Sequence, residues 1–118
     1  MRIDILYGLL AFVGGILTMF SSVNNDMYLL ALEKNETLPA GYSIHGLWPQ
    51  YTNGSYPQYC RKVSFDKDKI ENLVPKLDKF WASNEGSNDD FWKHEWQKHG
   101  SCMFVQMSEE EYFSKTLD

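Results

Sequence analysis

Two short segments of the chain hold side chains that can transfer protons. One is 43–50, with the sequence SIHGLWPQ, and the other is 91–102, with the sequence FWKHEWQKHGSC. Together they contain all three histidines, and the candidate reactive groups are His45, His94, Glu95, Lys98 and His99. Residues about four positions apart on a helix share a face. We therefore expect the four groups of the second segment to project within one arc, with Trp92 and Trp96 on a neighbouring face.

Three kinds of site use these residue types. A zinc site of the His-Glu-x-x-His type has its histidines four positions apart, whereas His94 and His99 are five apart and Lys98 would repel a cation. A structural role is the ordinary interpretation of one histidine, but it explains three in two compact segments less well. Acid–base cleavage of a phosphate ester needs one imidazole to accept a proton, another to donate one, and a cation. The residues suit this last chemistry, so we expect neither a metal nor another cofactor.

Residues 1–23 have the pattern of a secretory signal peptide. The segment 5–20 is mostly apolar, Arg2 precedes it, and Ser21 lies at the third position before a cleavage after Val23. The segment is short for a membrane span, and the alternatives are an uncleaved membrane anchor or a buried apolar helix. The remaining residues, 24–118, are enough for one domain.

Charge and cysteine content restrict the partners and the compartment. The formal net charge is −5, so the protein does not attract nucleic acid over its whole surface and must bind any RNA through a few placed cations. Behind a signal peptide, the pair Cys60 and Cys102 predicts a disulfide. Asn35 and Asn53 begin two glycosylation sequons. These features indicate a secreted glycoprotein.

The hydrophobic pattern predicts strands in the first half of residues 24–118. A short apolar run over 26–32 predicts a buried strand, and a loop follows over 33–41. Residues 42–47 predict a second strand, which Pro49 is expected to end because proline cannot donate to a sheet. The segment 51–59 is rich in Asn, Gly, Ser and Pro and predicts a turn region.

Helical spacing dominates the second half. Ser64 is the expected cap of a helix that begins near Phe65, and Pro75 either kinks this helix or begins a second one. The helix that carries the second reactive segment is expected to be capped by Asn88 or Asp89.

Two further signals concern helix ends. Gly100 is expected to end the second reactive helix in a left-handed conformation. Ser108 and Glu111 form a capping box for a last helix that runs toward Asp118.

The two reactive segments resemble the active-site motifs of the ribonuclease T2 family, secreted and lysosomal or vacuolar endoribonucleases that cut single-stranded RNA with little base preference. The motifs SIHGLWP and FWKHEWQKHGSC occur in the family's order, with YLLAL before them, LVPKLDKFW between them and EYFSKTLD after them. The resemblance runs from about Met27 onward. It implies an α+β fold with an antiparallel sheet packed against helices, the family's disulfide between Cys60 and Cys102, and a location outside the cell or in a lysosomal or vacuolar lumen.

The resemblance also implies a mechanism. His99 would be the general base that takes the proton of the ribose 2′-hydroxyl, and His45 the general acid that protonates the departing 5′-oxygen. The product would be a 2′,3′-cyclic phosphate, formed without a metal. The other implied roles are transition-state stabilisation by Glu95 and Lys98, phosphate binding by His94, and stacking on base or sugar by Trp48.

Two departures from the family bear on function. Residues 33–35, Glu-Lys-Asn, replace a Gln-Trp-Pro segment that is common in relatives, and an extra cysteine pair of relatives is absent, so the resemblance does not carry over substrate contacts from this loop. The family's domain has further strands after the last helix, so 24–118 is expected to be the N-terminal portion of such a domain, truncated at its C-terminus. We expect a monomer that acts on single-stranded RNA and not on DNA. The alternatives are an inactive secreted fragment with weak RNA binding at most, and a membrane-anchored interaction module that keeps 5–20.

Overall fold

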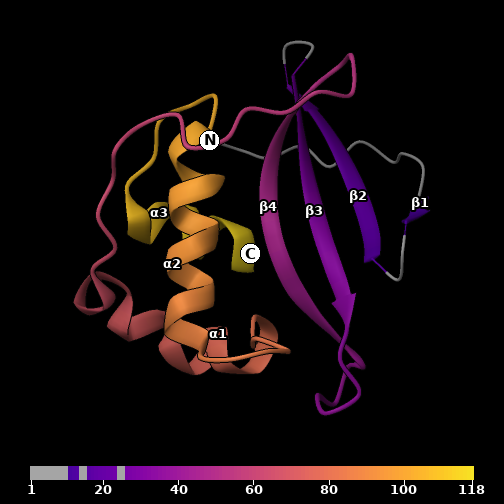
Figure 1. Ribbon diagram of the computed structural model, residues 1–118. Coiled ribbons are helices and arrows are strands. Elements are labelled where there is room, and N and C mark those ends of the chain that lie inside the picture. Colours follow the sequence, from indigo (N-terminus) through magenta and orange to yellow (C-terminus); the bar gives the residue numbers. More distant parts are fainter. Residues whose placement is uncertain (1–10, 14–15, 24–25) are drawn as a thin grey trace.

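An antiparallel sheet with helices packed on one side of it forms the described part of the chain, which confirms the expected α+β class. The structure is a computed structural model that describes residues 11–13, 16–23 and 26–118. Within these residues the sheet has the order β1-β2-β3-β4 (Figure 1), and its strands are β1 Ala11–Val13, β2 Ile16–Val23, β3 Asp26–Lys34 and β4 Tyr42–Tyr51. The helical elements are η1 Lys67–Leu73, α1 Val74–Phe80, α2 Asn88–Lys98, η2 Gly100–Cys102 and α3 Glu109–Leu117.

The two predicted strands are present and are longer than the pattern indicated. β3 continues to Lys34, and β4 runs through Pro49 to Tyr51, so the expectation that Pro49 ends the second strand is wrong. The reason is position in the sheet: β4 is an edge strand of the described sheet, where a residue without an N–H can be accommodated. The turn between the strands closes at Gly41, whose φ of 76° favours glycine.

The predicted signal peptide overlaps the first two strands. Its residues 1–10 and 14–15 lie outside the described residues, whereas Ile16–Val23 forms β2 and pairs with β3 from Ile16↔Glu33 to Val23↔Asp26. Cleavage after Val23 remains a prediction, and it would remove β2 and leave β3 as an edge strand. Among the described residues, no helix has both the length and the apolar character needed to cross a membrane.

The helix caps differ from the expected ones by one or two residues. η1 is capped by Asp66, whose side chain accepts from the Asp68 N–H, and not by Ser64. A second helix, α1, begins at Val74 with Pro75 in its first turn, so the second of the two alternatives holds with the start one residue earlier than expected. α2 is capped by Ser87, which accepts from the Asp90 N–H, so the assignment to Asn88 or Asp89 is wrong.

The ends of α2 and α3 are set by different means. α2 ends at Lys98, and Gly100 opens η2 without a positive φ, so the expected left-handed cap is wrong. Glycine is needed there because a Cβ would overlap the ring of Trp96. The capping box at Ser108 is confirmed, since its side chain accepts from the Glu111 N–H and the Glu111 carboxylate accepts from the Ser108 N–H.

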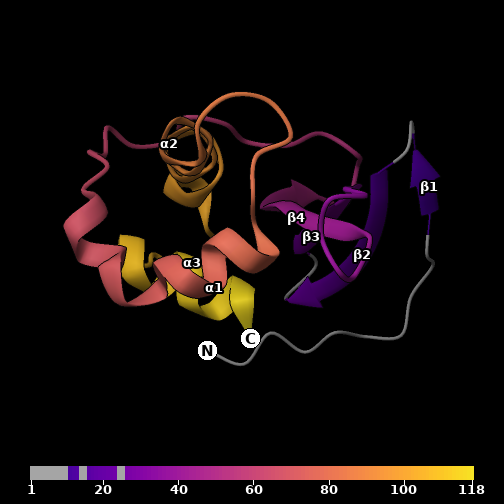
Figure 2. The same ribbon diagram turned by 90° about the horizontal axis from the view of Figure 1, so that it is seen from below.

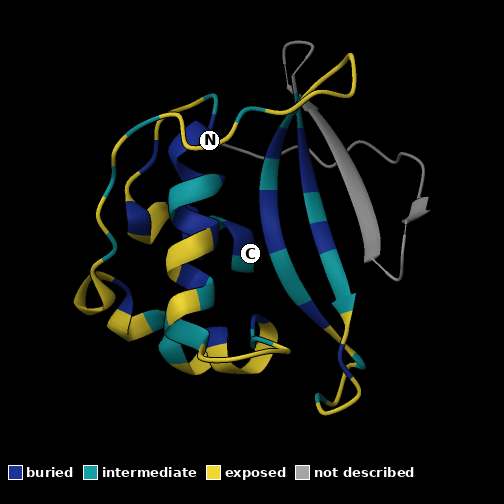
Figure 3. Cartoon of the chain, viewed as in Figure 1, coloured by how far each residue is buried: buried dark blue, intermediate teal, exposed yellow. Residues whose placement is uncertain are grey.

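The core lies between β4 and the helices. All three α-helices lie on one side of β4, and α1 and α3 lie together (Figure 2). Buried residues occur along β3, β4 and α2, whereas the connecting loops are mostly exposed (Figure 3). The largest fully buried aromatic side chains are Trp81, Trp92, Tyr28, Tyr112 and Phe113.

Hydrogen bonds join the helices to the backbone of β4. The Trp81 Nε1–H donates to the His45 carbonyl at 3.1 Å, and the Tyr112 hydroxyl donates to the Leu47 carbonyl at 3.0 Å. Trp92 Nε1–H donates in turn to the Trp81 carbonyl at 2.7 Å. These donors are buried and paired, so the bonds fix the position of β4 along the helices. That position decides which side chains of β4 and α2 contact each other.

Candidate active site

His45 is placed by a bulge in β4. In the ladder between β3 and β4, Ala31 is paired with Gly46 and Leu32 with Ile44, which leaves His45 as the extra residue of the bulge. A bulge bends its strand and redirects a side chain, and such irregularities are common beside active sites. The His45 carbonyl is held by Trp81, as described above, so the backbone of the bulge is anchored from the helical side.

α2 supplies the other groups of the predicted site. His94, Glu95 and Lys98 lie on this helix, and His99 is its C-terminal capping residue. Trp92 and Trp96 are buried in the core on a neighbouring face, which holds the helix in register with β4. His94, Glu95, Lys98 and His99 therefore project to one side of the helix, as predicted, where they line one cavity.

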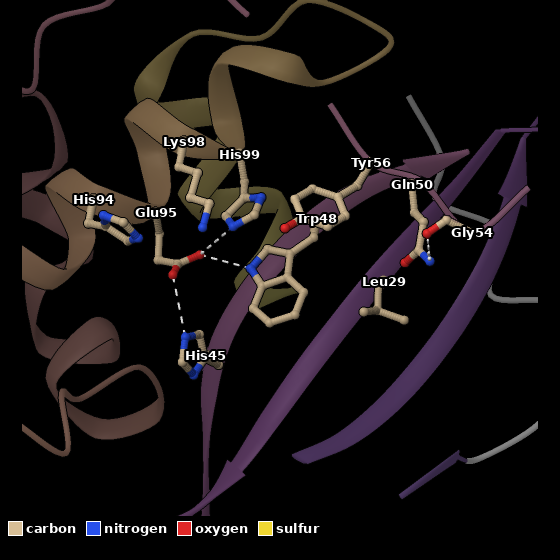
Figure 4. A pocket seen from close by; sticks show the side chains of 10 residues that line it. All are labelled: Leu29, His45, Trp48, Gln50, Gly54, Tyr56, His94, Glu95, Lys98 and His99. Carbon is tan, nitrogen blue, oxygen red and sulfur yellow. Dashed lines mark hydrogen bonds and ion pairs between the residues drawn. The ribbon is translucent and has the colours of Figure 1, made fainter. Parts of the chain in front are cut away.

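Glu95 lies at the centre of the site. Its side chain is 1% exposed, and it accepts a hydrogen bond from Trp48 Nε1–H at 2.9 Å (Figure 4). The Glu95 carboxylate is 3.6 Å from His45 Nε2 through Oε1 and 3.9 Å from His99 Nε2 through Oε2. Burial raises the pKa of Glu95 to about 7, and the Trp48 hydrogen bond and the Lys98 charge oppose part of this rise. Glu95 thus lies between two imidazoles, one from β4 and one from the C-terminal end of α2.

His99 is held as a neutral imidazole. Burial lowers its pKa to about 3, with smaller contributions in the same direction from the nearby Lys98, His94 and His45. Its ring stacks on Trp48 with a centroid distance of 5.1 Å. Among the described residues, His99 Nδ1 is buried without a hydrogen-bond partner, while Nε2 faces Glu95. A neutral imidazole of this kind can accept a proton.

A cavity of about 380 Å³ connects these groups. Burial, and after it the charges of Lys98 and His45, lower the pKa of His94, which is an exposed residue at the cavity's edge. All five predicted reactive residues and Trp48 line the cavity, and the other lining residues are Leu29, Gln50, Gly54 and Tyr56 (Figure 4). One face of Trp48 is already occupied by His99, so this indole supports the site as well as lining it.

The close approach of β4 to α2 depends on Gly46. A Cβ at this position would overlap the Glu95 carboxylate and the Trp48 indole. Gly46 is buried next to the bulged His45. Glycine at this point therefore allows the carboxylate of α2 to reach between the two histidines.

Glu33 belongs to the site although its sequence context gave no reason to include it. Its Oε2 is 3.1 Å from His45 Nδ1, on the side of the ring opposite Glu95. The contact depends on the β3–β4 register and on the bulge, neither of which can be derived from the hydrophobic pattern. Its only signal in the sequence was a carboxylate at the end of a predicted strand.

The disulfide is confirmed. Cys60 and Cys102 are bonded, with Cα atoms 5.0 Å apart, and the bond ties the segment after β4 to η2. The two sequons differ in exposure: Asn53 is exposed in a turn, whereas Asn35 is 6% exposed. In each, the sequon hydroxyl donates to the asparagine Oδ1. A glycan on Asn35 would require its side chain to leave a buried position, and glycosylation at either residue remains a prediction.

Comparison with known proteins identifies the class. The model of the ribonuclease T2 family matches residues 20–118, and the chain belongs to this family. It is 41% identical over 83 residues to Ribonuclease 1 of Arabidopsis thaliana, covering 67% of this chain and 36% of that protein. It is 48% identical over 61 residues to Ribonuclease DdI of Dictyostelium discoideum, covering 52% of this chain and 27% of that protein.

A solved structure supports the same fold. The structure of RNase NT in complex with 5′-AMP matches with a TM-score of 0.59 and 43% identity, covering 65% of this chain and 39% of that one. The chain spans about a third of the length of the curated relatives that it matches. Relatives from Solanum lycopersicum include an extracellular ribonuclease, LE, and an intracellular one, LX.

Proposed function

We propose that this protein is an endoribonuclease that cleaves single-stranded RNA by metal-free acid–base catalysis between two histidines. The observation that carries the proposal is the cavity in which His45 and His99 lie 3.6 Å and 3.9 Å from the two oxygens of one buried carboxylate. An acid and a base on either side of a reacting phosphate, with a cation beside them, are the groups that internal transesterification requires. Two findings are consistent with an RNA substrate. The relatives that match the chain are named ribonucleases, and the matching structure of RNase NT is a complex with 5′-AMP.

The proposed reaction begins at His99. Its neutral imidazole takes the proton of the ribose 2′-hydroxyl, and the oxygen then forms a bond to the adjacent phosphorus. The bond from phosphorus to the 5′-oxygen breaks, and His45 gives the Nε2 proton to this leaving group. The products are a 2′,3′-cyclic phosphate and a free 5′-hydroxyl, and the two histidines regain their starting states by exchange with water.

Glu95, Lys98 and His94 would act on the phosphate. The Lys98 ammonium supplies positive charge to the pentacoordinate transition state, and His94 binds the phosphate from the exposed edge of the cavity. Glu95 is mostly protonated below neutral pH because burial raises its pKa to about 7, so it can donate a hydrogen bond to a phosphate oxygen at acidic pH. His99 remains neutral under the same conditions because its pKa is lowered to about 3, so the proposed base and the proposed hydrogen-bond donor are both in their working forms at acidic pH.

The test is cleavage of a single-stranded RNA near pH 5 in the presence of EDTA. The purified protein is compared with its His45→Ala and His99→Ala variants, after circular dichroism has established that all three are folded. We expect cyclic-phosphate ends, detected by mass spectrometry, and a loss of about 10²–10⁴-fold in each variant. Folded wild-type protein that leaves RNA intact, or cleavage that continues in either variant, would contradict the proposal and favour a non-catalytic protein.

We also propose that the protein is secreted or enters a lysosomal or vacuolar lumen as a monomer. The apolar segment 5–20 and the disulfide support this location. N-terminal sequencing of the expressed protein tests the predicted cleavage after Val23, and a retained N-terminus would favour either a membrane anchor or a mature fold that keeps β2.

A further inference from the structure

His45 has two ring nitrogens, and Nε2 faces Glu95. Among the described residues, the side chain that contacts the other nitrogen, Nδ1, is that of Glu33. The Glu33 Oε2 and His45 Nδ1 atoms are 3.1 Å apart, and both side chains are about one-third exposed. The neighbouring cation does not compete for this carboxylate, because Lys34 Nζ is paired with Glu36 at 2.7 Å. Glu33 is therefore available to accept a hydrogen bond from the imidazole.

The register of the sheet makes this contact specific. Glu33 is paired with Ser43, two residues before His45, and side chains at such diagonal positions on an antiparallel pair are within reach when one is long. The bulge then adds the displacement that brings the His45 ring over the end of β3. The edge of the Phe91 ring packs against the imidazole at a centroid distance of 5.3 Å and limits its rotation.

The chemical consequence concerns which nitrogen of His45 faces the substrate. A carboxylate at Nδ1 accepts its N–H and leaves Nε2, which lies 3.6 Å from Glu95 Oε1, pointing into the cavity. After Nε2 has given up its proton, Nδ1 keeps its own, so the neutral ring has the tautomer that is ready to be protonated again. A base or acid oriented by a third group is a recurring arrangement in catalysis.

We propose that Glu33 is the positioning residue of the general acid: it holds the His45 Nδ1–H so that Nε2 donates its proton to the departing 5′-oxygen. This inference rests on the proposed function.

The experiment compares two substrates that share the attacking 2′-hydroxyl and differ in the leaving group. One is the dinucleotide uridylyl-(3′,5′)-adenosine, whose ribose 5′-oxygen must be protonated as it departs. The other is uridine 3′-(4-nitrophenyl phosphate), whose nitrophenolate departs without a proton. The variants are Glu33→Ala and Glu33→Gln. The matched control is Glu36→Gln, which removes a nearby charge that does not contact His45 while leaving an amide oxygen that can still accept from Lys34.

We expect Glu33→Ala to lower kcat on the dinucleotide by about 10- to 100-fold, the range found for partners that orient metal-bound histidines, with KM nearly unchanged. On the nitrophenyl ester the same variant should lose little. Glu33→Gln should fall between the wild type and Glu33→Ala on the dinucleotide, because its amide oxygen still accepts the Nδ1–H. Glu36→Gln should behave as the wild type does on both substrates.

Two results would overturn the proposal alone: equal losses on both substrates, or no loss on either. A folded wild-type protein that cleaves neither substrate faster than His45→Ala would overturn the proposed function as well. A second readout is independent of activity. In ¹⁵N NMR spectra at a pH where His45 is neutral, the proton should be on Nδ1 in the wild type and should move toward Nε2 in Glu33→Ala. The same tautomer in both proteins would count against the assigned contact.

Discussion

Burial moves the proton equilibria of two groups in the cavity in opposite directions. The pKa of Glu95 rises from 4.5 to about 7 and that of His99 falls from 6.5 to about 3, and desolvation is the largest cause of both shifts. Glu95 therefore contributes stability that is fully present below pH 4.5 and is lost as the pH rises through 7. His99 contributes stability that is present above pH 6.5 and is lost as the pH falls through 3. Between about pH 3 and pH 7, the Glu95 carboxyl and the His99 imidazole are therefore both largely in their neutral forms.

We expect Glu95→Gln to stabilise the protein at alkaline pH and to have little effect near pH 4. Glutamine has the same shape, can accept the Trp48 N–H, and cannot ionise. The gain in the free energy of unfolding at pH 8 should be at most about 3 kcal/mol, because the pKa of Glu95 rises from 4.5 to about 7 on folding. Urea denaturation of both proteins at pH 4 and pH 8 measures it. If the two proteins differ by the same amount at both pH values, the ionisation of Glu95 is not what limits stability.

The residues of the site were more predictable than their contacts. His45, His94, Glu95, Lys98 and His99 could be grouped from the sequence because four of them share one short helix and the fifth lies in a motif with its own aromatic anchor. All five line one cavity. Glu33 could not be found in this way, because its partner is selected by a bulge 12 residues further along the chain, and strand register is not encoded in a hydrophobic pattern.

At the scale of elements, the site depends on how closely β4 and α2 approach. Gly46 has no side chain at the point where the Glu95 carboxylate and the Trp48 indole meet the strand. The bulge next to it turns His45 toward the same carboxylate. One strand and one helix thus carry most of the proposed catalytic groups. A small shift of β4 relative to α2 would move the proposed acid, His45, away from the proposed base, His99.

We expect Gly46→Ala to lower turnover even in the fraction of protein that remains folded. The added methyl group must displace Glu95 or Trp48, and overpacking of this kind costs about 1–3 kcal/mol of stability. Gly41→Ala is a matched control, because its left-handed backbone makes alanine unfavourable by about 1–2 kcal/mol while no atom lies within 4 Å of the new Cβ. Both variants should lose stability in thermal denaturation, and only Gly46→Ala should lose kcat per folded molecule. Equal kcat values in the two variants would contradict this account of the close approach.

Helix boundaries were predicted less well than the helices themselves. The segment before η1 offers Ser64 and Asp66 as caps, and the one before α2 offers Ser87, Asn88 and Asp89. All of these residues favour N-cap positions, so propensity cannot choose among them. The choice is made by packing: burial of Ile70, Trp92 and Trp96 fixes the rotation of each helix, and the cap is the residue that then precedes its first turn.

At the scale of the whole molecule, the segment between β4 and η1 is a long connection that passes over the end of α2 (Figure 1). The Tyr59 N–H donates to the Lys98 carbonyl at 2.9 Å, next to the disulfide. The backbone at Lys98 and His99 is therefore held from both sides, by α2 and by this connection. Residues 16–20 illustrate the limit of pattern at this scale, because they belong to the apolar run that predicts a signal peptide and, in the structure, form part of β2 against β3.

We expect the disulfide to stabilise the whole described fold without taking part in the chemistry. Cys60 and Cys102 are 42 residues apart, and on the chain-entropy model a link across a loop of this length contributes on the order of 4 kcal/mol to the free energy of unfolding. The double variant Cys60→Ala/Cys102→Ala should unfold at a lower urea concentration than the oxidised wild type, and reductant should lower the midpoint of the wild type only. Where the variant is still folded, its kcat should stay close to that of the wild type, because the bond lies beyond His99 and reaches the cavity only through the backbone. A wild-type midpoint that does not respond to reductant would mean that the link adds no stability, and a folded variant with a much lower kcat would mean that the bond sets the position of His99 directly.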